Sequence, residues 1–142
     1  MFSQIGVIFI VDHVKEIINN SNDAVSIASF ESFETEETTN IYSGTFKGTW
    51  YCATDMGYTS SPYGSSGRTL ETGYSVASNY FEPGTLLYIE GDGITGTYRV
   101  DDTGEMSSDV IDFYYWDRDY IPESFLIAGR INIQVYIIGK GT

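Results

Sequence analysis

Two aspartates, Asp102 and Asp112, are the side chains best suited to chemistry in this sequence. Each follows an apolar residue at a spacing of two, Val100 and Val110 respectively, so each is expected on a partly buried strand face. Burial disfavours a charged carboxylate, and a second carboxylate nearby raises one of the two pKa values further. A protonated acid beside an ionised one is the pair that cleavage of a glycosidic bond uses. The alternative is that both aspartates cap turns by accepting backbone N–H bonds.

The segment between the two aspartates predicts how they meet. It contains Gly104, which suits a turn, and we expect this turn to return the second segment beside the first, so that the carboxylates share a groove. Asp101, in contrast, falls on the opposite strand face together with Arg99. The period of two therefore predicts that Asp101 and Arg99 form an ion pair at the surface.

The overall composition argues against several other chemistries. The 142 residues carry 7 Lys and Arg against 20 Asp and Glu, a net charge of −13, which repels phosphate backbones and makes nucleic acid an unexpected partner. With one cysteine, Cys52, and one histidine, His13, the sequence offers no zinc-type cluster, and we expect no metal and no cofactor. No run approaches the ~20 apolar residues that span a bilayer, so no membrane span is expected.

The beginning of the chain differs from the rest. Apolar residues recur at helical spacing between Val7 and Ile18 and predict one amphipathic helix within residues 1–22. Residues 23–40 are rich in Glu, Ser and Thr and are expected to form an acidic linker. The apolar face of the helix has to be covered by its own domain or by another chain, and a homodimer through this helix is one such arrangement. No basic residue precedes the apolar run, which argues against a signal peptide.

Residues 41–142 have the composition of short strands and tight turns. Alternation over Ile131–Ile137 predicts a strand with one buried face, and Pro122 and Gly129 suit the start and the stop of a short helix just before it. The other predicted strands are 44–54, 74–78, 85–90, 96–102 and 110–114. The sequence therefore predicts one all-β domain with six strands.

Three short motifs follow one another within this domain: Pro83-Gly84-Thr85, Asp102-Thr103-Gly104 and Ile111-Asp112. In this order they resemble the bacterial three-aspartate (3D) domain, which occurs in peptidoglycan lytic transglycosylases and in cell-wall proteins of spore-forming Gram-positive bacteria; RlpA and expansin barrels are similar. The resemblance covers roughly residues 44–138. It implies an all-β fold, a six-stranded double-psi β-barrel with a short helix before the last strand. It also implies peptidoglycan glycan strands as the partner and an extracellular or cell-wall location, with a phage as the alternative origin.

The resemblance assigns roles to individual residues. Asp102 and Asp112 match two of the three family aspartates. The first aspartate falls on Ala77 or its neighbour Ser78, so that one carboxylate is missing and the Ser78 hydroxyl is expected to contribute in its place. Asp112 is implied to be the acid that protonates the bond between N-acetylmuramic acid and N-acetylglucosamine, and then the base that leaves a 1,6-anhydro end. Asp102 is implied to position or polarise the site.

Four further residues are candidates for contact with substrate. Thr49 and Tyr51 lie where related domains carry a Thr or Tyr near the carboxylates, Thr103 belongs to the Asp-Thr-Gly motif, and Tyr114 follows the second aspartate at a spacing of two. Each of these residues, taken alone, is also explained by packing within the domain.

Two other classes of function stay open. The missing first aspartate favours a non-catalytic glycan-binding or wall-loosening module of the expansin kind. The unpartnered apolar face of the N-terminal helix favours a structural or assembly role, for instance in a phage or a spore.

Overall fold

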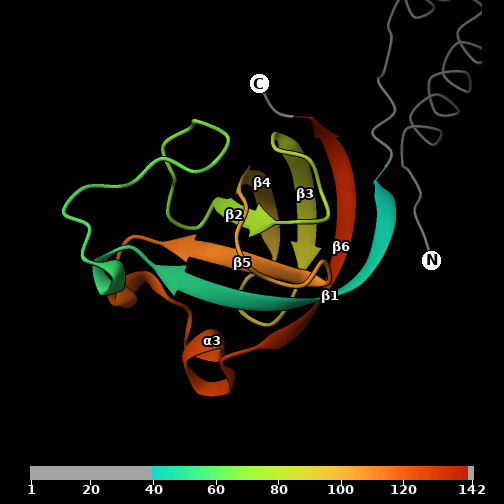
Figure 1. The fold of residues 1–142 in the computed structure, drawn as a ribbon. Coiled ribbons are helices and arrows are strands. Elements are labelled where there is room, and N and C mark those ends of the chain that lie inside the picture. Colours follow the sequence, from blue (N-terminus) through green and yellow to red (C-terminus); the bar gives the residue numbers. More distant parts are fainter. Residues whose placement is uncertain (1–39, 141–142) are drawn as a thin grey trace, which may run out of the picture. The chain divides into compact units, whose positions relative to one another are not determined.

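The computed structural model describes residues 40–140, and Figure 1 shows the fold that these residues adopt. The amphipathic helix predicted for residues 1–22 lies outside the described residues, as does nearly all of the predicted acidic linker. Within residues 40–140, no helix has the length and the hydropathy that crossing a lipid bilayer requires.

Six strands of the described chain close into a barrel, which confirms the all-β prediction for this part. They are β1 (Ile41–Cys52), β2 (Ser75–Ser78), β3 (Thr85–Glu90), β4 (Gly96–Asp102), β5 (Val110–Tyr115) and β6 (Ile131–Lys140). Around the barrel they follow the order β1-β5-β2-β4-β3-β6, and β6 pairs with β1 to close the ring. Every strand predicted from the sequence is present.

The first strand begins earlier than predicted because it contains a bulge. Ile41 and Tyr42 pair with β6, and the register then shifts between Tyr42 and Gly44. Gly44 has φ +128°, a conformation that favours glycine, and it interrupts the alternation from which a strand is predicted. The residues before Gly44 therefore belong to β1 although their sequence pattern does not indicate it.

Two of the six strand pairings are parallel, β1 with β5 and β2 with β4, and the other four are antiparallel. Exchanging β1 with β4, β2 with β5 and β3 with β6 reproduces all six pairings, so the topology has an approximate two-fold symmetry. In the β2–β5 ladder, Ala77 pairs with Asp112 at the central position. The symmetry axis therefore passes through the point where two of the predicted site positions meet.

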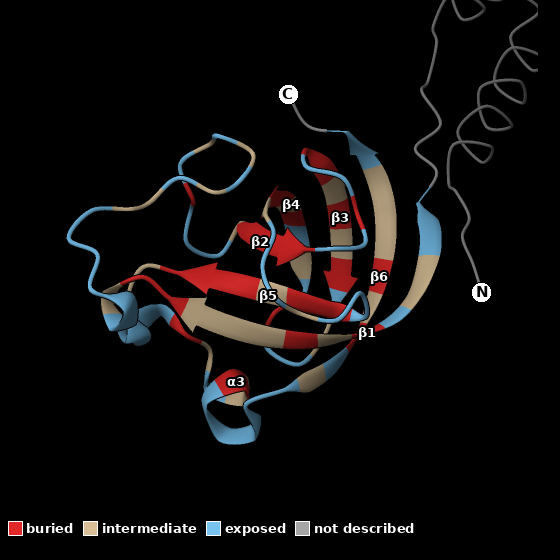
Figure 2. Ribbon diagram, viewed as in Figure 1, coloured by how far each residue is buried: buried red, intermediate tan, exposed pale blue. Residues whose placement is uncertain are grey.

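The interior of the barrel is apolar and takes one face of each strand. Its fully buried side chains include Val76, Leu87, Ile89, Val100, Ile111, Phe113, Ile133 and Val135. Figure 2 shows this burial on β3, β5 and β6, and shows that β2 is buried along its whole length. On β1 the inward side chains are Phe46, Trp50 and Cys52, and on β5 they are Ile111 and Phe113. The alternate residues of both strands, Thr49, Tyr51 and Asp112 among them, therefore face away from the interior.

A short helix, α3 (Glu123–Ala128), lies before the last strand, as predicted. Pro122 is its N-cap, and the amide of Gly129, at φ +74°, donates to the carbonyl of Phe125 and ends the helix. The ring of Phe125 is fully buried and packs on that of Phe113, with 5.3 Å between ring centroids. The helix thus covers one end of the barrel.

Candidate functional site

Four residues on four neighbouring strands form one row across the outer face of the barrel. Thr49 of β1 pairs with Asp112 of β5, Asp112 pairs with Ala77 of β2, and Ala77 pairs with Asp102 of β4. This row is consistent with the prediction that the two aspartates share one site. The prediction that the second strand returns directly beside the first was wrong, because β2 lies between β5 and β4.

Ala77 separates the two carboxylates and adds no polar group to the row. Its methyl group is 3% exposed. Under the approximate symmetry of the barrel, Ala77 is the counterpart of Asp112, and Thr49 is the counterpart of Asp102. The row is thus built from two equivalent halves, each with one carboxylate, and the carboxylates occupy different positions in the two halves.

Asp112 is half-buried, and its carboxylate accepts a hydrogen bond from the neighbouring strand β1. The Oγ1 atom of Thr49 donates to Oδ1 of Asp112 over 2.7 Å, and within residues 40–140 this is the one hydrogen bond to that carboxylate. Burial raises the pKa of Asp112, the hydrogen bond from Thr49 lowers it, and the negative charge of Asp102 raises it again, with a net upward shift. Asp112 therefore keeps its proton to a higher pH than an ordinary aspartate.

Asp102, in contrast, faces three hydrogen-bond donors. Tyr51 Oη donates to Oδ2 over 3.1 Å, and the amides of Ser65 and Thr103 each donate to Oδ1 over 2.9 Å. Burial and the nearby Asp102 raise the pKa of Tyr51, so its hydroxyl remains a donor. The Thr103 amide belongs to the next residue, and the other two donors come from distant parts of the chain. Together they fix the orientation of the carboxylate.

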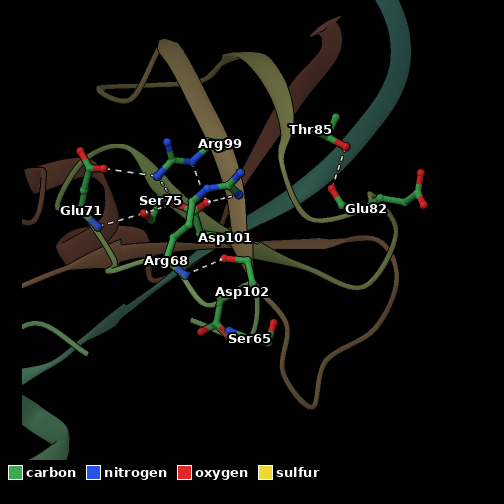
Figure 3. Close-up of polar contacts among 10 residues, drawn as sticks. Ser65, Arg68, Glu71, Ser75, Glu82, Thr85, Arg99, Asp101 and Asp102 are labelled. Atoms are coloured by element: carbon green, nitrogen blue, oxygen red, sulfur yellow. Dashed lines mark hydrogen bonds and ion pairs between the residues drawn. The ribbon is translucent and has the colours of Figure 1, made fainter. Parts of the chain in front are cut away.

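Asp101 corrects the sequence-based prediction. Its pairing with Arg99 is confirmed, by Nε–Oδ1 and Nη2–Oδ2 distances of 2.7 and 2.9 Å, but the pair is not at the surface: Asp101 is 0% exposed. Ser75 Oγ donates to the same carboxylate over 2.6 Å, and Nη1 of Arg68 lies 3.6 Å from it. Figure 3 shows both arginines reaching Asp101, with Glu71 at the outer end of Arg99.

The period of two correctly places Asp101 on the face of Arg99, so the alternation does not explain its burial. A bulge affects the next residue: Val76 pairs with Val100 and Ala77 pairs with Asp102, so the alternation changes between Asp101 and Asp102. The connection between β1 and β2 then covers Asp101, since the amide of Ser66 donates to its carbonyl over 3.2 Å.

The remaining candidates divide into two groups. Thr49, Tyr51 and Thr103 contact the aspartates, as described above. Ser78 does not take the place of a carboxylate: it is fully buried, and its hydroxyl accepts the amides of Tyr80 and Phe81 in the turn after β2. A buried Ser followed by a turn is used to satisfy backbone donors there.

Tyr114 is a buried neighbour of the site. It is 0% exposed, its hydroxyl lies 2.8 Å from Ser61 Oγ, and its ring packs edge-on against Tyr51 with 5.5 Å between centroids. Its position supports Tyr51, which in turn donates to Asp102. This burial argues against direct contact between Tyr114 and a ligand.

Ser65 is the site residue that the sequence does not reveal. It lies between Gly64 and Gly67, and glycines at this spacing indicate a tight turn. Which strand end such a turn covers depends on tertiary packing, so its contact with Asp102 has no local signal.

Comparison of the sequence with protein-family models gives no match, and comparison with curated proteins gives none. The function has to be inferred from the side chains and their geometry. These provide one carboxyl group whose pKa is raised, a second carboxylate held by three donors, and hydroxyl groups between strands.

Proposed function

We propose that this domain is a double-psi β-barrel of the 3D kind that cleaves glycan strands of peptidoglycan by lytic transglycosylation. Two properties of the barrel support the fold type: its closed ring of six strands, and its two parallel pairings, each between strands that are not consecutive in sequence. The observation that carries the function is the row in which Asp112 and Asp102 flank a single alanine.

The different surroundings of the two carboxyl groups suit two different roles. The raised pKa of Asp112 suits a general acid, which protonates the glycosidic oxygen between N-acetylmuramic acid and N-acetylglucosamine. As the carbon–oxygen bond breaks, positive charge develops at the anomeric carbon, and the carboxylate of Asp102 stabilises it. Thr49 donates a hydrogen bond to Asp112 and Tyr51 donates one to Asp102, so each carboxyl group is oriented by its own hydroxyl donor.

The second half of the reaction returns the proton. Asp112, now a carboxylate, accepts the proton of the 6-hydroxyl of the muramoyl residue, and the oxygen of that hydroxyl forms a bond with the anomeric carbon. The products are a 1,6-anhydromuramoyl end and a free N-acetylglucosamine end. Asp112 has regained its proton, and no water is consumed.

Mass spectrometry of purified peptidoglycan after incubation with the full chain tests this reaction. We expect anhydromuropeptides from the wild type and from Asp92→Asn, which changes an exposed aspartate in the β3–β4 turn, and far fewer from Asp112→Asn. Reducing ends in place of anhydro ends would show hydrolysis and contradict the transglycosylase mechanism.

Ala77 favours a second candidate, a glycan-binding module without catalysis. At the position where the family resemblance expects a carboxylate, the row has a methyl group instead. A wild type that sediments with peptidoglycan sacculi but releases no soluble products would support this candidate. Both candidates imply a location at the cell wall, which is part of the proposal.

A further inference from the structure

The loop Gly64–Arg68 in the connection between β1 and β2 lies against the end of β4. The amide of Gly64 donates to the carbonyl of Arg68 over 2.8 Å, and the amide of Gly67 donates to the carbonyl of Gly64 over 2.9 Å. The loop is therefore closed on itself. A shift at one of its residues moves the others with it.

Asp101 fastens this loop to β4. Its carbonyl accepts the amide of Ser66 over 3.2 Å, and its carboxylate lies 3.6 Å from Nη1 of Arg68. A Cβ atom on Gly64 would lie 2.2 Å from the carbonyl oxygen of Asp101, closer than any side chain permits. Glycine is required at position 64 because the two backbones approach so closely.

The same loop holds Asp102, the next residue along β4. The amide of Ser65 donates to Oδ1 of Asp102 over 2.9 Å, and the hydroxyl of Ser65 accepts from Thr103 Oγ1 over 3.2 Å. Two consecutive loop residues, Ser65 and Ser66, therefore bind two consecutive strand residues. Figure 3 shows Ser65 beside Asp102, with Arg68 extending from the other end of the loop toward Asp101.

We propose that Gly64 and Asp101 are positioning residues for Asp102. The close approach at Gly64 and the buried charge of Asp101 set the place of the loop, and the loop sets the orientation of the Asp102 carboxylate through the Ser65 amide. The role of Asp102 in catalysis rests on the proposed function. The positioning itself is measured without turnover.

NMR of the full chain tests the positioning directly. An amide that donates to a carboxylate changes its proton shift when that carboxylate ionises, so in the wild type the amides of Ser65 and Thr103 titrate together, and Asp102→Asn abolishes both responses. Gly64→Ala is expected to abolish the response of Ser65 and to leave that of Thr103. Gly139→Ala is the matched control, because a Cβ there meets no atom within 4 Å; it should titrate like the wild type.

Arg68→Gln is a milder second variant, for the case in which Gly64→Ala does not fold. It removes only the ion contact with Asp101, and we expect faster hydrogen exchange at the Ser65 amide with the Thr103 amide unchanged. A Ser65 amide that does not titrate in the wild type, or that is unchanged in the folded variants, overturns the proposal.

The activity assay separates this proposal from the proposed function. If the wild type releases anhydromuropeptides, Gly64→Ala should lower kcat by up to about 10²-fold with little change in KM, because the catalytic carboxylate is misplaced. If the wild type releases none, the proposed function fails while the amide titration still decides the positioning. An active Gly64→Ala with a normal Ser65 titration would contradict the positioning alone.

Discussion

Asp101 and Asp112 differ both in burial and in the partners of their carboxylates. Asp101 is fully buried, with Arg99 on both of its carboxylate oxygens and Arg68 nearby. Asp112 is half-buried on the outer face of β5, and within residues 40–140 it forms no ion pair; its partner is the neutral hydroxyl of Thr49. Removing the carboxylate of Asp101 would leave buried arginine charge poorly compensated, whereas Asp112 has no cation beside it within residues 40–140 and burial raises its pKa.

The largest effect is expected from breaking the charged pair. Asp101→Asn leaves Arg99, whose side chain is 14% exposed, with only the more exposed Glu71 as a counter-charge at 3.3 Å. Removing one partner of a buried pair costs about 3–5 kcal/mol, and urea denaturation at neutral pH measures this loss of unfolding free energy. Asp92→Asn is the control and should resemble the wild type. An unchanged urea midpoint for Asp101→Asn would show that the contacts of Asp101 with the arginines do not stabilise the fold.

The next effect is on the rate of glycan cleavage. Asp112→Asn keeps the shape of the site but removes the transferable proton, and general acid–base catalysis contributes typically ~10²–10⁴-fold. Asp102→Asn should lower the rate less, because it removes only an electrostatic contribution. Rates of release of anhydromuropeptides measure both losses. Equal rates for the wild type and Asp112→Asn, with both proteins folded, would rule out Asp112 as the acid.

The fold could be predicted from the sequence more fully than the site. Five strands follow from a composition of aromatic residues, Gly, Ser and Thr, the last strand follows from alternation, and the short helix follows from Pro122 and Gly129, because these signals are local. The burial of Asp101 could not be predicted, since it depends on a distant loop that covers it. The contact of Ser65 with Asp102 depends on the same loop. Residues whose role depends on where a distant loop packs leave no periodic pattern.

The stability that Asp112 contributes should depend on pH. The pKa of Asp112 is raised in the folded protein above its ordinary value of 3.8. The folded state therefore binds the proton more tightly than the unfolded state. The stability from this group is fully present below about pH 3.8 and is lost as pH rises through the raised pKa.

Asp112→Asn removes this pH dependence. Urea denaturation across a pH series should show the variant gaining stability relative to the wild type as pH rises above about 3.8. Titrations of carboxylates that do not interact with Asp112 cancel in the difference between the two proteins. A difference that stays constant with pH would show that the pKa of Asp112 is not raised by folding.

Substitution of Thr49 should have a smaller and more specific effect, on the unfolding free energy and on the pKa of Asp112. Its hydrogen bond lowers the pKa of Asp112 against the effect of burial. Thr49→Val keeps the shape of the side chain, removes the donor, and should cost about 1 kcal/mol of unfolding free energy. It should also raise the pKa of Asp112, which carbon-detected NMR titration measures. Thr45→Val, on the exposed part of the same strand, is the control and should leave that pKa unchanged.

The smallest effect is expected at an ion pair that is exposed to solvent. Lys140 and Glu82 form an ion pair with 3.7 Å between Nζ and Oε2, and their side chains are 60% and 86% exposed. Water already solvates both charges, so Lys140→Gln should change the unfolding free energy by less than about 0.5 kcal/mol, and salt should screen even that. Thermal unfolding at low and high salt measures it beside Asp101→Asn. Lys140→Gln breaks one exposed ion pair, whereas Asp101→Asn breaks buried contacts with Arg99 and Arg68. A comparable loss in the two variants would show that burial adds nothing to the stability that the Asp101 contacts provide.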